Sequence, residues 1–445
     1  MCTIGTPDLS LDLYVLPVGG SGAPDGDKYI IYRPLLKLAF VGIAPGDLPP
    51  AAGRYLGRIG FLEPDPPPPP PREPEYRPTN AVLLLTNRCY LRCVYWYARG
   101  GEGRVESLSP ELARTAIDHV HRNAVDLGRD HFRVTFHGGG EPTRLWRTLE
   151  MATDYARAKD LPCRVSMVSN GVWTDRQRDW IIPNLNALTV SFDGGRETQD
   201  RQRPLASGSS SFEAVMRSLD KLDEAGFRYS IRMTALAPWR DRLAHDVEFL
   251  CRETGCRYIQ VEPAFNVERG GYDSPTPEEA EDFCAGFMQA FEIAQRAGRR
   301  LVYSGARPWL LTHSFCSAPY GGLVVNPAGG LVTCYEITNA GHPLAGLCTV
   351  GHIQEGQIQV DAAARQAVLG RMDARRDVCR QCFNYWHCGG DCHVKTLYPG
   401  ADAQPLASTR CQINRHLLAQ MLLWYMAEAE DGVYRGRPPG QKKLP

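Results

Sequence analysis

Two cysteines four residues apart, Cys89 and Cys93, lie directly after an apolar, strand-like run at residues 81–85. Thiolates at this spacing, on a loop that leaves the C-terminal end of a strand, are well placed to hold a metal cluster. Aromatic side chains in the same run would shield such a cluster from water. These aromatic residues are Tyr90, Tyr95, Trp96 and Tyr97.

A second set of cysteines lies between residues 316 and 411. Paired cysteines at a distance are typical of zinc ribbons and of iron–sulfur sites alike, so the spacing alone leaves both metals open. A reducing cytosol would argue against disulfides. The cysteines with informative spacing are Cys316, Cys334, Cys379, Cys382, Cys388, Cys392 and Cys411.

The composition of the chain narrows its class. With 445 residues, we expect two or three domains. The 50 basic and 50 acidic residues cancel, which leaves no overall basic field to attract nucleic acid. No apolar stretch approaches the ~20 residues that span a bilayer, and the N-terminus lacks the features of a signal peptide. We therefore expect a cytoplasmic protein without nucleic-acid or membrane partners.

Strand-like and helix-like runs alternate from residue 80 to about residue 300. This alternation predicts an α/β fold with a parallel sheet, in which ligand-binding loops gather at the carboxyl ends of the strands. Ser109 and Thr276 are expected to cap helices, and Ser210 with Glu213 is expected to form a capping box. We expect strands at 81–85, 132–136, 163–168, 187–191, 229–235 and 258–261, and helices at 110–125, 145–159, 176–182, 212–225, 243–254 and 277–297.

The clearest boundary is a run of six prolines, Pro66 to Pro71, which predicts a stiff polyproline II spacer. The N-terminal module before it, with strands expected within 29–41 and a helix at 51–62, could cap the barrel or dock a peptide. The expected units are residues 1–63 (N-terminal module), 64–79 (linker), 80–305 (barrel), 306–412 (cysteine-rich domain) and 413–445 (closing helix, then a disordered tail from Gly432).

Small, polar, glycine-containing loops follow the first four predicted strands of the barrel. In this order they resemble the core of the radical S-adenosylmethionine (SAM) enzymes, a partial (β/α)6, TIM-like barrel. The resemblance implies that Cys89 and Cys93 hold a [4Fe-4S] SAM cluster. The loops are Cys-x3-Cys, then Gly139-Gly140-Glu141-Pro142, then Ser169-Asn170-Gly171, then Ser191-Phe192-Asp193-Gly194. The implied SAM contacts are Gly139, Gly140 and Glu141 for the amino group, Ser169, Asn170, Ser191 and Asp193 for the ribose and carboxylate side, and Arg203 for the carboxylate.

The C-terminal cysteines resemble the SPASM extension, which follows radical SAM cores in enzymes that modify peptides and proteins. The resemblance implies two auxiliary [4Fe-4S] clusters, and the upstream core favours iron–sulfur over zinc. Cys348 is an off-pattern candidate for the open fourth position of one cluster, while His387 and His393 are expected to hydrogen-bond near the clusters. The implied ligands are Cys379, Cys382, Cys388 and Cys411 for one cluster and Cys316, Cys334 and Cys392 for the other.

Trp96 stands where the radical SAM signature has its third cysteine. Indole offers an N–H donor and no lone pair suited to iron, so it cannot replace a thiolate. Three explanations stay open: a degenerate member that binds SAM or peptide, a recent or introduced substitution or sequence error, and a distant cysteine that completes the site. The intact motifs around Trp96 favour the second.

The sequence therefore predicts a radical SAM/SPASM maturase with activity impaired by Trp96. It would act on a side chain of a ribosomally made peptide or protein through hydrogen abstraction by a 5′-deoxyadenosyl radical. Its partners would be that substrate and an electron donor such as a flavodoxin or ferredoxin. The alternative is a non-catalytic SAM- or peptide-binding iron–sulfur protein, and a zinc-stabilised scaffold is a weaker third interpretation.

Overall fold

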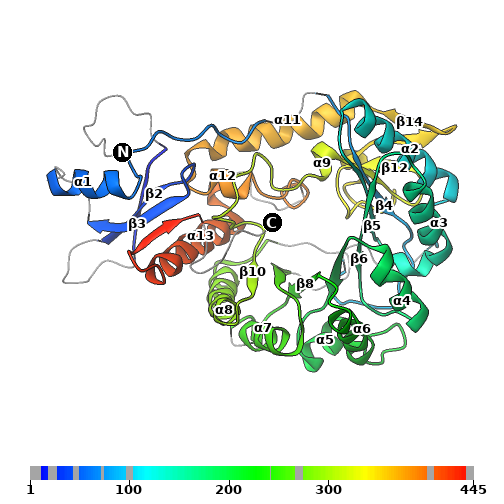
Figure 1. Ribbon diagram of the computed structural model, residues 1–445, viewed down its shortest axis with the longest axis horizontal. Coiled ribbons are helices and arrows are strands. Elements are labelled where there is room, and N and C mark those ends of the chain that lie inside the picture. Colours follow the sequence, from blue (N-terminus) through cyan, green and yellow to red (C-terminus); the bar gives the residue numbers. More distant parts are fainter. Residues whose placement is uncertain are drawn as a thin grey trace.

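The computed structural model describes residues 12–18, 28–43, 50–71, 75–96, 104–240, 242–265, 274–397 and 405–436. Its described strands form an antiparallel sheet of order β1-β2-β3-β15 and a larger sheet of order β10-β9-β8-β7-β6-β5-β4-β11-β12-β13-β14. Figure 1 shows the smaller sheet beside α13 at one end of the molecule, and the larger sheet curving through the other end.

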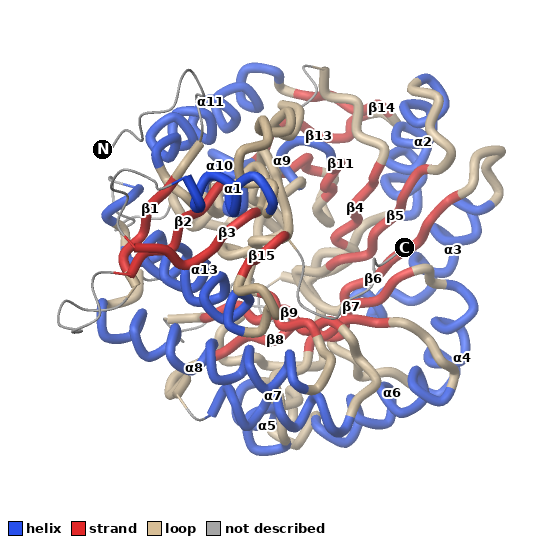
Figure 2. Tube along the Cα trace, turned by 60° about the vertical axis from the view of Figure 1, so that its left-hand side comes forward, coloured by secondary structure: helices blue, strands red, loops and turns tan. Residues whose placement is uncertain are grey.

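The strands from β4 to β10 run parallel to their neighbours, which confirms the predicted partial barrel. Helices α2 to α8 cover the outer face of this curved sheet (Figure 2). The strands are β4 (Asn80–Leu84), β5 (Phe132–His137), β6 (Cys163–Ser169), β7 (Ala187–Ser191), β8 (Tyr229–Ala235), β9 (Tyr258–Pro263) and β10 (Arg300–Val302). The helices are α2 (Pro110–Asp126), α3 (Trp146–Arg157), α4 (Asp175–Asn184), α5 (Arg196–Gln202), α6 (Phe212–Glu224), α7 (Arg242–Glu253) and α8 (Pro277–Arg296).

Two of the three predicted helix caps form. Ser109 accepts from the third residue of α2, and Thr276 makes a reciprocal capping box with Glu279 at the start of α8. The predicted box of Ser210 with Glu213 is wrong. Helix α5, which the sequence did not reveal, draws both residues away: its Asp200 accepts from the Ser210 hydroxyl, and its Arg196 pairs with Glu213.

The cysteine-rich region continues the barrel sheet rather than standing apart from it. Strand β11 pairs in parallel with β4, the first strand of the barrel, and β12 to β14 follow in antiparallel order. This pairing places the cysteine-bearing loops beside the mouth of the barrel. The strands are β11 (Gly322–Val325), β12 (Gly330–Val332), β13 (Thr349–Gln354) and β14 (Gln357–Val360), and the helices are α9 (Ala318–Gly321), α10 (Ala345–Cys348), α11 (Ala362–Val378), α12 (Tyr385–Cys388) and α13 (Thr409–Ala427).

The N-terminal module has the predicted strands and helix, but its sheet is completed by the other end of the chain. Strand β15 (Val433–Arg435) pairs with β3, and its Val433 and Tyr434 are buried. The predicted disorder from Gly432 is therefore wrong for residues 433–435. Two apolar residues within a polar segment gave too weak a pattern to predict a strand. No helix of the described part of the chain is both long and apolar enough to cross a membrane. The module contains β1 (Tyr14–Pro17), β2 (Lys28–Arg33), β3 (Leu38–Ile43) and α1 (Pro50–Arg58).

Candidate active site and metal centres

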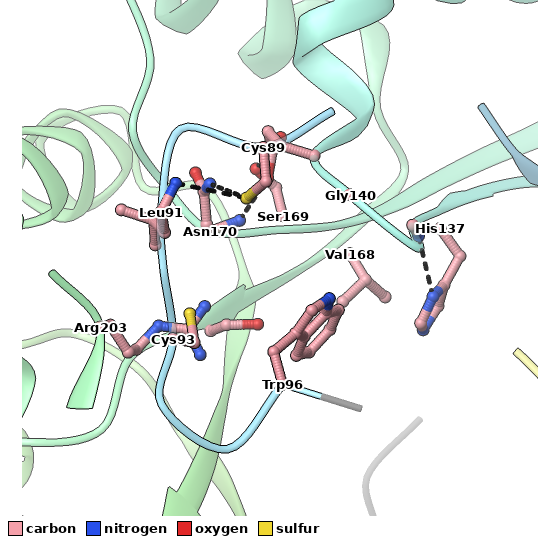
Figure 3. A pocket seen from close by; sticks show the side chains of 13 residues that line it. Cys89, Leu91, Cys93, Trp96, His137, Gly140, Val168, Ser169, Asn170 and Arg203 are labelled. Atoms are coloured by element: carbon pink, nitrogen blue, oxygen red, sulfur yellow. Dashed lines mark hydrogen bonds between the residues drawn. The ribbon is translucent and has the colours of Figure 1, made fainter. Parts of the chain in front are cut away.

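A pocket lies at the carboxyl ends of β5, β6 and β7, beside the loop that follows β4 (Figure 3). The space between its walls, including the part open to solvent, is about 450 Å³. Polar groups from four loops converge there, as the order of the motifs predicts. The predicted site residues in its wall are Cys89, Cys93, Gly140, Glu141, Ser169, Asn170, Ser191 and Arg203.

Two predicted contacts, Gly139 and Asp193, are not among the lining residues. The Asp193 carboxylate is fully buried and accepts from the Tyr95 hydroxyl at 2.7 Å and the Gln202 amide at 2.9 Å. It also accepts from the backbone N–H of Thr234 at 3.0 Å. Because internal donors surround this carboxylate, it supports the wall of the pocket from behind.

Glu141 lines the pocket, yet its carboxylate is committed to neighbouring loops. One oxygen accepts from the Ser169 hydroxyl at 2.7 Å and the Thr143 hydroxyl at 2.9 Å. The other accepts from the backbone N–H of Asn170 at 2.8 Å. Burial raises the pKa of Glu141, while these hydrogen bonds oppose that rise. Glu141 thus fastens the loop after β5 to the loop after β6, which sets Asn170 Nδ2 at 3.7 Å from Cys89 Sγ.

Arg203, at the end of α5, brings a buried cation to the pocket. It donates to the Tyr95 hydroxyl and lies 3.9 Å from Asp193. Burial opposes its charge, but Cys93, Tyr95 and Asp193 outweigh that effect and raise the pKa of Arg203. Its buried Nε–H has no hydrogen-bond partner among the described residues. Arg203 thus lines the pocket with one N–H donor that the described residues leave unpaired.

Trp96 is integrated into the pocket rather than turned away from it. Its Nε1–H donates to the carbonyl oxygen of Gly139 at 2.8 Å, and its ring lines the cavity beside Cys89 and Cys93 (Figure 3). Burial, followed by the charges of Cys93 and Glu141, raises the pKa of the Cys89 thiol to about 12. No other described cysteine lines this pocket. Two sulfurs and an indole donor do not fit a cluster that requires three thiolates. Tyr97 lies outside the described residues.

His137 is a lining residue that the sequence reasoning did not select. Its Nδ1 accepts from the backbone N–H of Gly138 at 3.0 Å, so Nε2 carries the proton of the neutral ring. Burial lowers the pKa of His137 to about 4. The ring stacks on Tyr335, with 4.6 Å between centroids, and Tyr335 follows Cys334 in the chain. His137 could have been identified from the sequence by its position at the end of a predicted strand, directly before the glycine loop. Leu91 and Val168 also line the pocket and were not predicted.

Four of the C-terminal cysteines surround one cavity. Two side-chain donors point at their sulfurs: Arg375 reaches Cys411 Sγ at 3.6 Å, and Asn414 reaches Cys388 Sγ at 3.6 Å. In the described residues, no group of three or more His, Cys, Asp or Glu side chains converges as ligands of a single metal ion. The four sulfurs instead enclose a space, which fits the four-thiolate set of a [4Fe-4S] cluster. We call this set the four-cysteine group: Cys379, Cys382, Cys388 and Cys411.

The remaining three cysteines pack around the same small apolar cluster, and we call Cys316, Cys334 and Cys392 the three-cysteine group. Burial, and then charges that include those of Cys392 and Cys316, raise the pKa of the Cys334 thiol. Cys348 belongs to the same apolar cluster, but after burial the charges that act on it come from Glu336 and Arg371. The role of Cys348 as a fourth ligand of this group therefore stays a prediction.

The two histidines that flank these cysteines differ from each other. His387 pairs with the Tyr32 hydroxyl and, at 2.7 Å, with the carbonyl of Leu310, so its hydrogen bonds tie the N-terminal sheet to the cysteine-rich region. His387 directly precedes Cys388 in the chain, and its role near a cluster stays a prediction. His393 contacts the Thr333 hydroxyl at 3.4 Å, and its buried Nδ1 has no partner among the described residues.

Known proteins resemble this chain chiefly over the barrel. The Radical SAM superfamily model matches residues 83–250. Fe-coproporphyrin III synthase of Methanosarcina barkeri is 33% identical over 189 residues, which cover 39% of this chain and 44% of that protein. A serine-type anaerobic sulfatase-maturating enzyme of Klebsiella aerogenes is 25% identical, over 46% of this chain and 51% of that enzyme. The sporulation killing factor maturation protein SkfB of Bacillus subtilis is 27% identical, over 44% of each chain.

These alignments span about half the length of the curated relatives. Among solved structures, anSMEcpe with bound AdoMet (SAM) superposes with a TM-score of 0.59 at 15% identity, over 77% of this chain and 96% of that one. At this identity the likeness shows a shared fold and nothing finer. Residues 83–250, which form most of the partial barrel, therefore belong to the radical SAM superfamily.

Proposed function

We propose that this chain is a radical SAM/SPASM maturase that acts on a side chain of a peptide or protein, and that Trp96 severely weakens its radical step. The four-cysteine group beside the barrel is the observation that carries this proposal, because auxiliary clusters next to a SAM pocket are typical of such maturases. Two matched relatives are named as a sulfatase-maturating enzyme and a killing-factor maturation protein. A structure of anSMEcpe holds a peptide together with AdoMet.

The residues of the pocket would bind SAM without supplying the complete cluster site. Asn170 and Ser191 offer hydrogen-bonding groups on one side, and Arg203 offers a buried cation with a free N–H for a carboxylate. Iron–sulfur clusters, when bound at the C-terminal cysteines, would supply single-electron transfer. A flavodoxin or ferredoxin in the cytoplasm would be the electron donor.

Trp96 would weaken activity in two ways. It withholds the third thiolate, and its indole N–H occupies the carbonyl of Gly139, which the family resemblance assigns to the SAM amino group. Two thiols alone would leave the iron labile or absent. Hydrogen abstraction by this chain therefore depends on a ligand that the described residues do not supply.

The test is anaerobic reconstitution of the unsubstituted chain and of Trp96→Cys. We expect about eight irons per unsubstituted chain and about twelve in the variant, since each cluster holds four. With reduced flavodoxin or ferredoxin supplying the electron, cleavage of SAM to methionine and, after hydrogen abstraction, 5′-deoxyadenosine should rise about a hundredfold or more in Trp96→Cys. Trp96→Ala is the matched control, because it removes the indole without adding a thiolate. Equal cleavage by the unsubstituted chain and Trp96→Cys would refute this account of Trp96.

A second function is favoured by the fit of Trp96 within the pocket. A residue that hydrogen-bonds to Gly139 and packs beside both cysteines suits a non-catalytic protein that binds SAM or a peptide. Calorimetry with SAM separates the two functions. Binding by the unsubstituted chain, with no cleavage even in Trp96→Cys, would support the second function and exclude the first.

A further inference from the structure

One short loop joins the four-cysteine group to the three-cysteine group. Between Cys388 and Cys392, three successive residues, Gly389, Gly390 and Asp391, have φ angles of 71°, 93° and 67°. Glycine adopts this left-handed backbone at no steric cost, whereas an aspartate does so at a penalty. A Cβ at Gly389 would also meet the backbone of Ser314 at 2.4 Å. The loop is therefore tightly constrained, and Asp391 is the one residue in it that brings a charge.

The Asp391 carboxylate is buried, and both of its oxygens accept hydrogen bonds. Its Oδ1 accepts from the backbone N–H of Cys392 at 2.7 Å and from Arg410 Nη2 at 2.9 Å. Its Oδ2 accepts from Arg410 Nε at 3.1 Å and lies 3.8 Å from Arg375 Nη2. The side chain of Asp391 is only 2% exposed, and those of both arginines are 13% exposed. These three residues form a largely buried ion triad of two cations and one anion.

The triad touches both cysteine groups. Arg375, near the end of α11, donates to Cys411 Sγ at 3.6 Å and to the carbonyl of Gly390 at 2.9 Å. Arg410 directly precedes Cys411 in α13, while Asp391 is bonded to the amide of Cys392. A single charge change in the triad would therefore act on sulfurs of the four-cysteine group at close range, where the low dielectric strengthens it.

We propose that Asp391, Arg375 and Arg410 form a charge-balancing unit that sets the reduction potential of the cluster held by the four-cysteine group. The inference rests on the auxiliary clusters of the proposed function. Reduction adds one electron to that site, and the guanidinium groups of Arg375 and Arg410 stabilise the added charge. The N–H···S bond of Arg375 acts in the same direction, because hydrogen bonds to ligand sulfurs raise the potential.

Substitution of the aspartate and substitution of either arginine should shift the reduction potential in opposite directions. Asp391→Asn removes a negative charge and should raise the potential, favouring reduction by about tenfold, which is about 59 mV for one electron. Arg375→Gln and Arg410→Gln each remove a positive charge and should lower it by a similar factor. A loop that merely closed the chain would change cluster content or stability without this pairing of signs.

The experiment is a redox titration, followed by electron paramagnetic resonance, of the anaerobically reconstituted full chain and its variants. Asp377→Asn is the matched control. Asp377 forms a 2.9 Å ion pair with Arg380 beside Cys379, but the Asp377 side chain is 65% exposed and that of Arg380 is 72% exposed. Solvent should screen that change, so little shift is expected.

Iron analysis comes first. If the unsubstituted chain holds no iron, the auxiliary clusters and this inference both fail. If iron is present and Asp391→Asn shifts the potential no more than Asp377→Asn, the inference alone is overturned. Should Asp391→Asn fail to load, the two arginine variants decide the matter: a fall in potential supports the unit, and no change or a rise refutes it.

Discussion

The pocket at the barrel mouth and the four-cysteine group are two cysteine sites of one chain, and they are built differently. The pocket takes both its cysteines from one loop after β4, whereas the four-cysteine group draws on the segments around α12 and on α13. In the pocket, Glu141 and Asp193 hold the loops together through hydrogen bonds that involve no cysteine sulfur. Much of the pocket is thus held in shape by groups other than its cysteines, while the four-cysteine group is defined by its sulfurs.

The structural roles of Glu141 and Asp193 bear on the origin of Trp96. Intact motifs around Trp96 indicate a recent substitution only if SAM binding is the sole function of those motifs. Glu141 joins two loops, and Asp193 balances a buried arginine, so both have structural work that continues without a cluster. Their presence is therefore equally compatible with a site that lost its third thiolate long ago. The intact four-cysteine group is the stronger sign that the chain still handles iron.

The largest contrast should appear in iron content. Cys388→Ser removes one of the four proposed ligands around the C-terminal cavity and should cost about four irons per chain. Cys93→Ser should leave the iron of the unsubstituted chain unchanged, because the pocket is short of ligands already. Iron and sulfide analysis after anaerobic reconstitution measures both. Equal losses in the two variants would show that the pocket holds a cluster despite Trp96.

A smaller contrast concerns stability. Asp193→Ala leaves the Arg203 cation buried without its carboxylate, and breaking such a pair costs about 3–5 kcal/mol of unfolding free energy. Urea unfolding of the reconstituted chain measures the loss. Glu213→Gln is the control, because its ion pair with Arg196 is more than half exposed and should contribute little. A loss for Asp193→Ala no larger than that for the control would mean that water reaches Arg203.

The sequence predicted the repeated elements well and the long-range partners poorly. Strand β8 has the predicted bounds, because alternating buried residues and flanking helices mark it locally. The pairing of β11 with β4 joins segments far apart in the chain, and no local pattern encodes which edge a strand will choose. The same limit hid β15, whose three residues are stabilised by β3 rather than by their own composition.

For the candidate site, the motifs identified which loops meet, but not which way each side chain faces. Ser-x-Asp-Gly places Asp193 at the end of β7, yet whether its carboxylate faces the pocket depends on the donors behind it. The stack of His137 on Tyr335 likewise depends on two loops brought together only by the β11–β4 pairing. Residue types were therefore predictable, and their partners were not.

His137 gives the pocket a dependence on pH. Its pKa is about 4 in the folded chain and about 6.5 when unfolded, so the unfolded state binds more protons between these values. The free energy of unfolding is therefore unaffected by this group above pH 6.5. Protonation of the unfolded state lowers it by about 3 kcal/mol as the pH drops to 4. His137→Phe, which keeps a ring against Tyr335, should flatten that part of the stability curve. An unchanged slope in urea unfolding at several pH values would contradict this.

The smallest effect separates the two roles of Trp96. Trp96→Phe keeps an aromatic ring beside the cysteines but removes the N–H that donates to Gly139 at 2.8 Å. The loss of one neutral hydrogen bond should cost about 1 kcal/mol of unfolding free energy. It should also free the Gly139 carbonyl, so SAM should bind more tightly while cleavage stays absent, since no thiolate is added. Calorimetry with SAM measures the binding, and product analysis measures the cleavage.

Tighter binding without cleavage would show that the indole N–H weakens SAM binding and that the missing thiolate prevents the chemistry. Unchanged binding would show that the Gly139 carbonyl is not part of the ligand site.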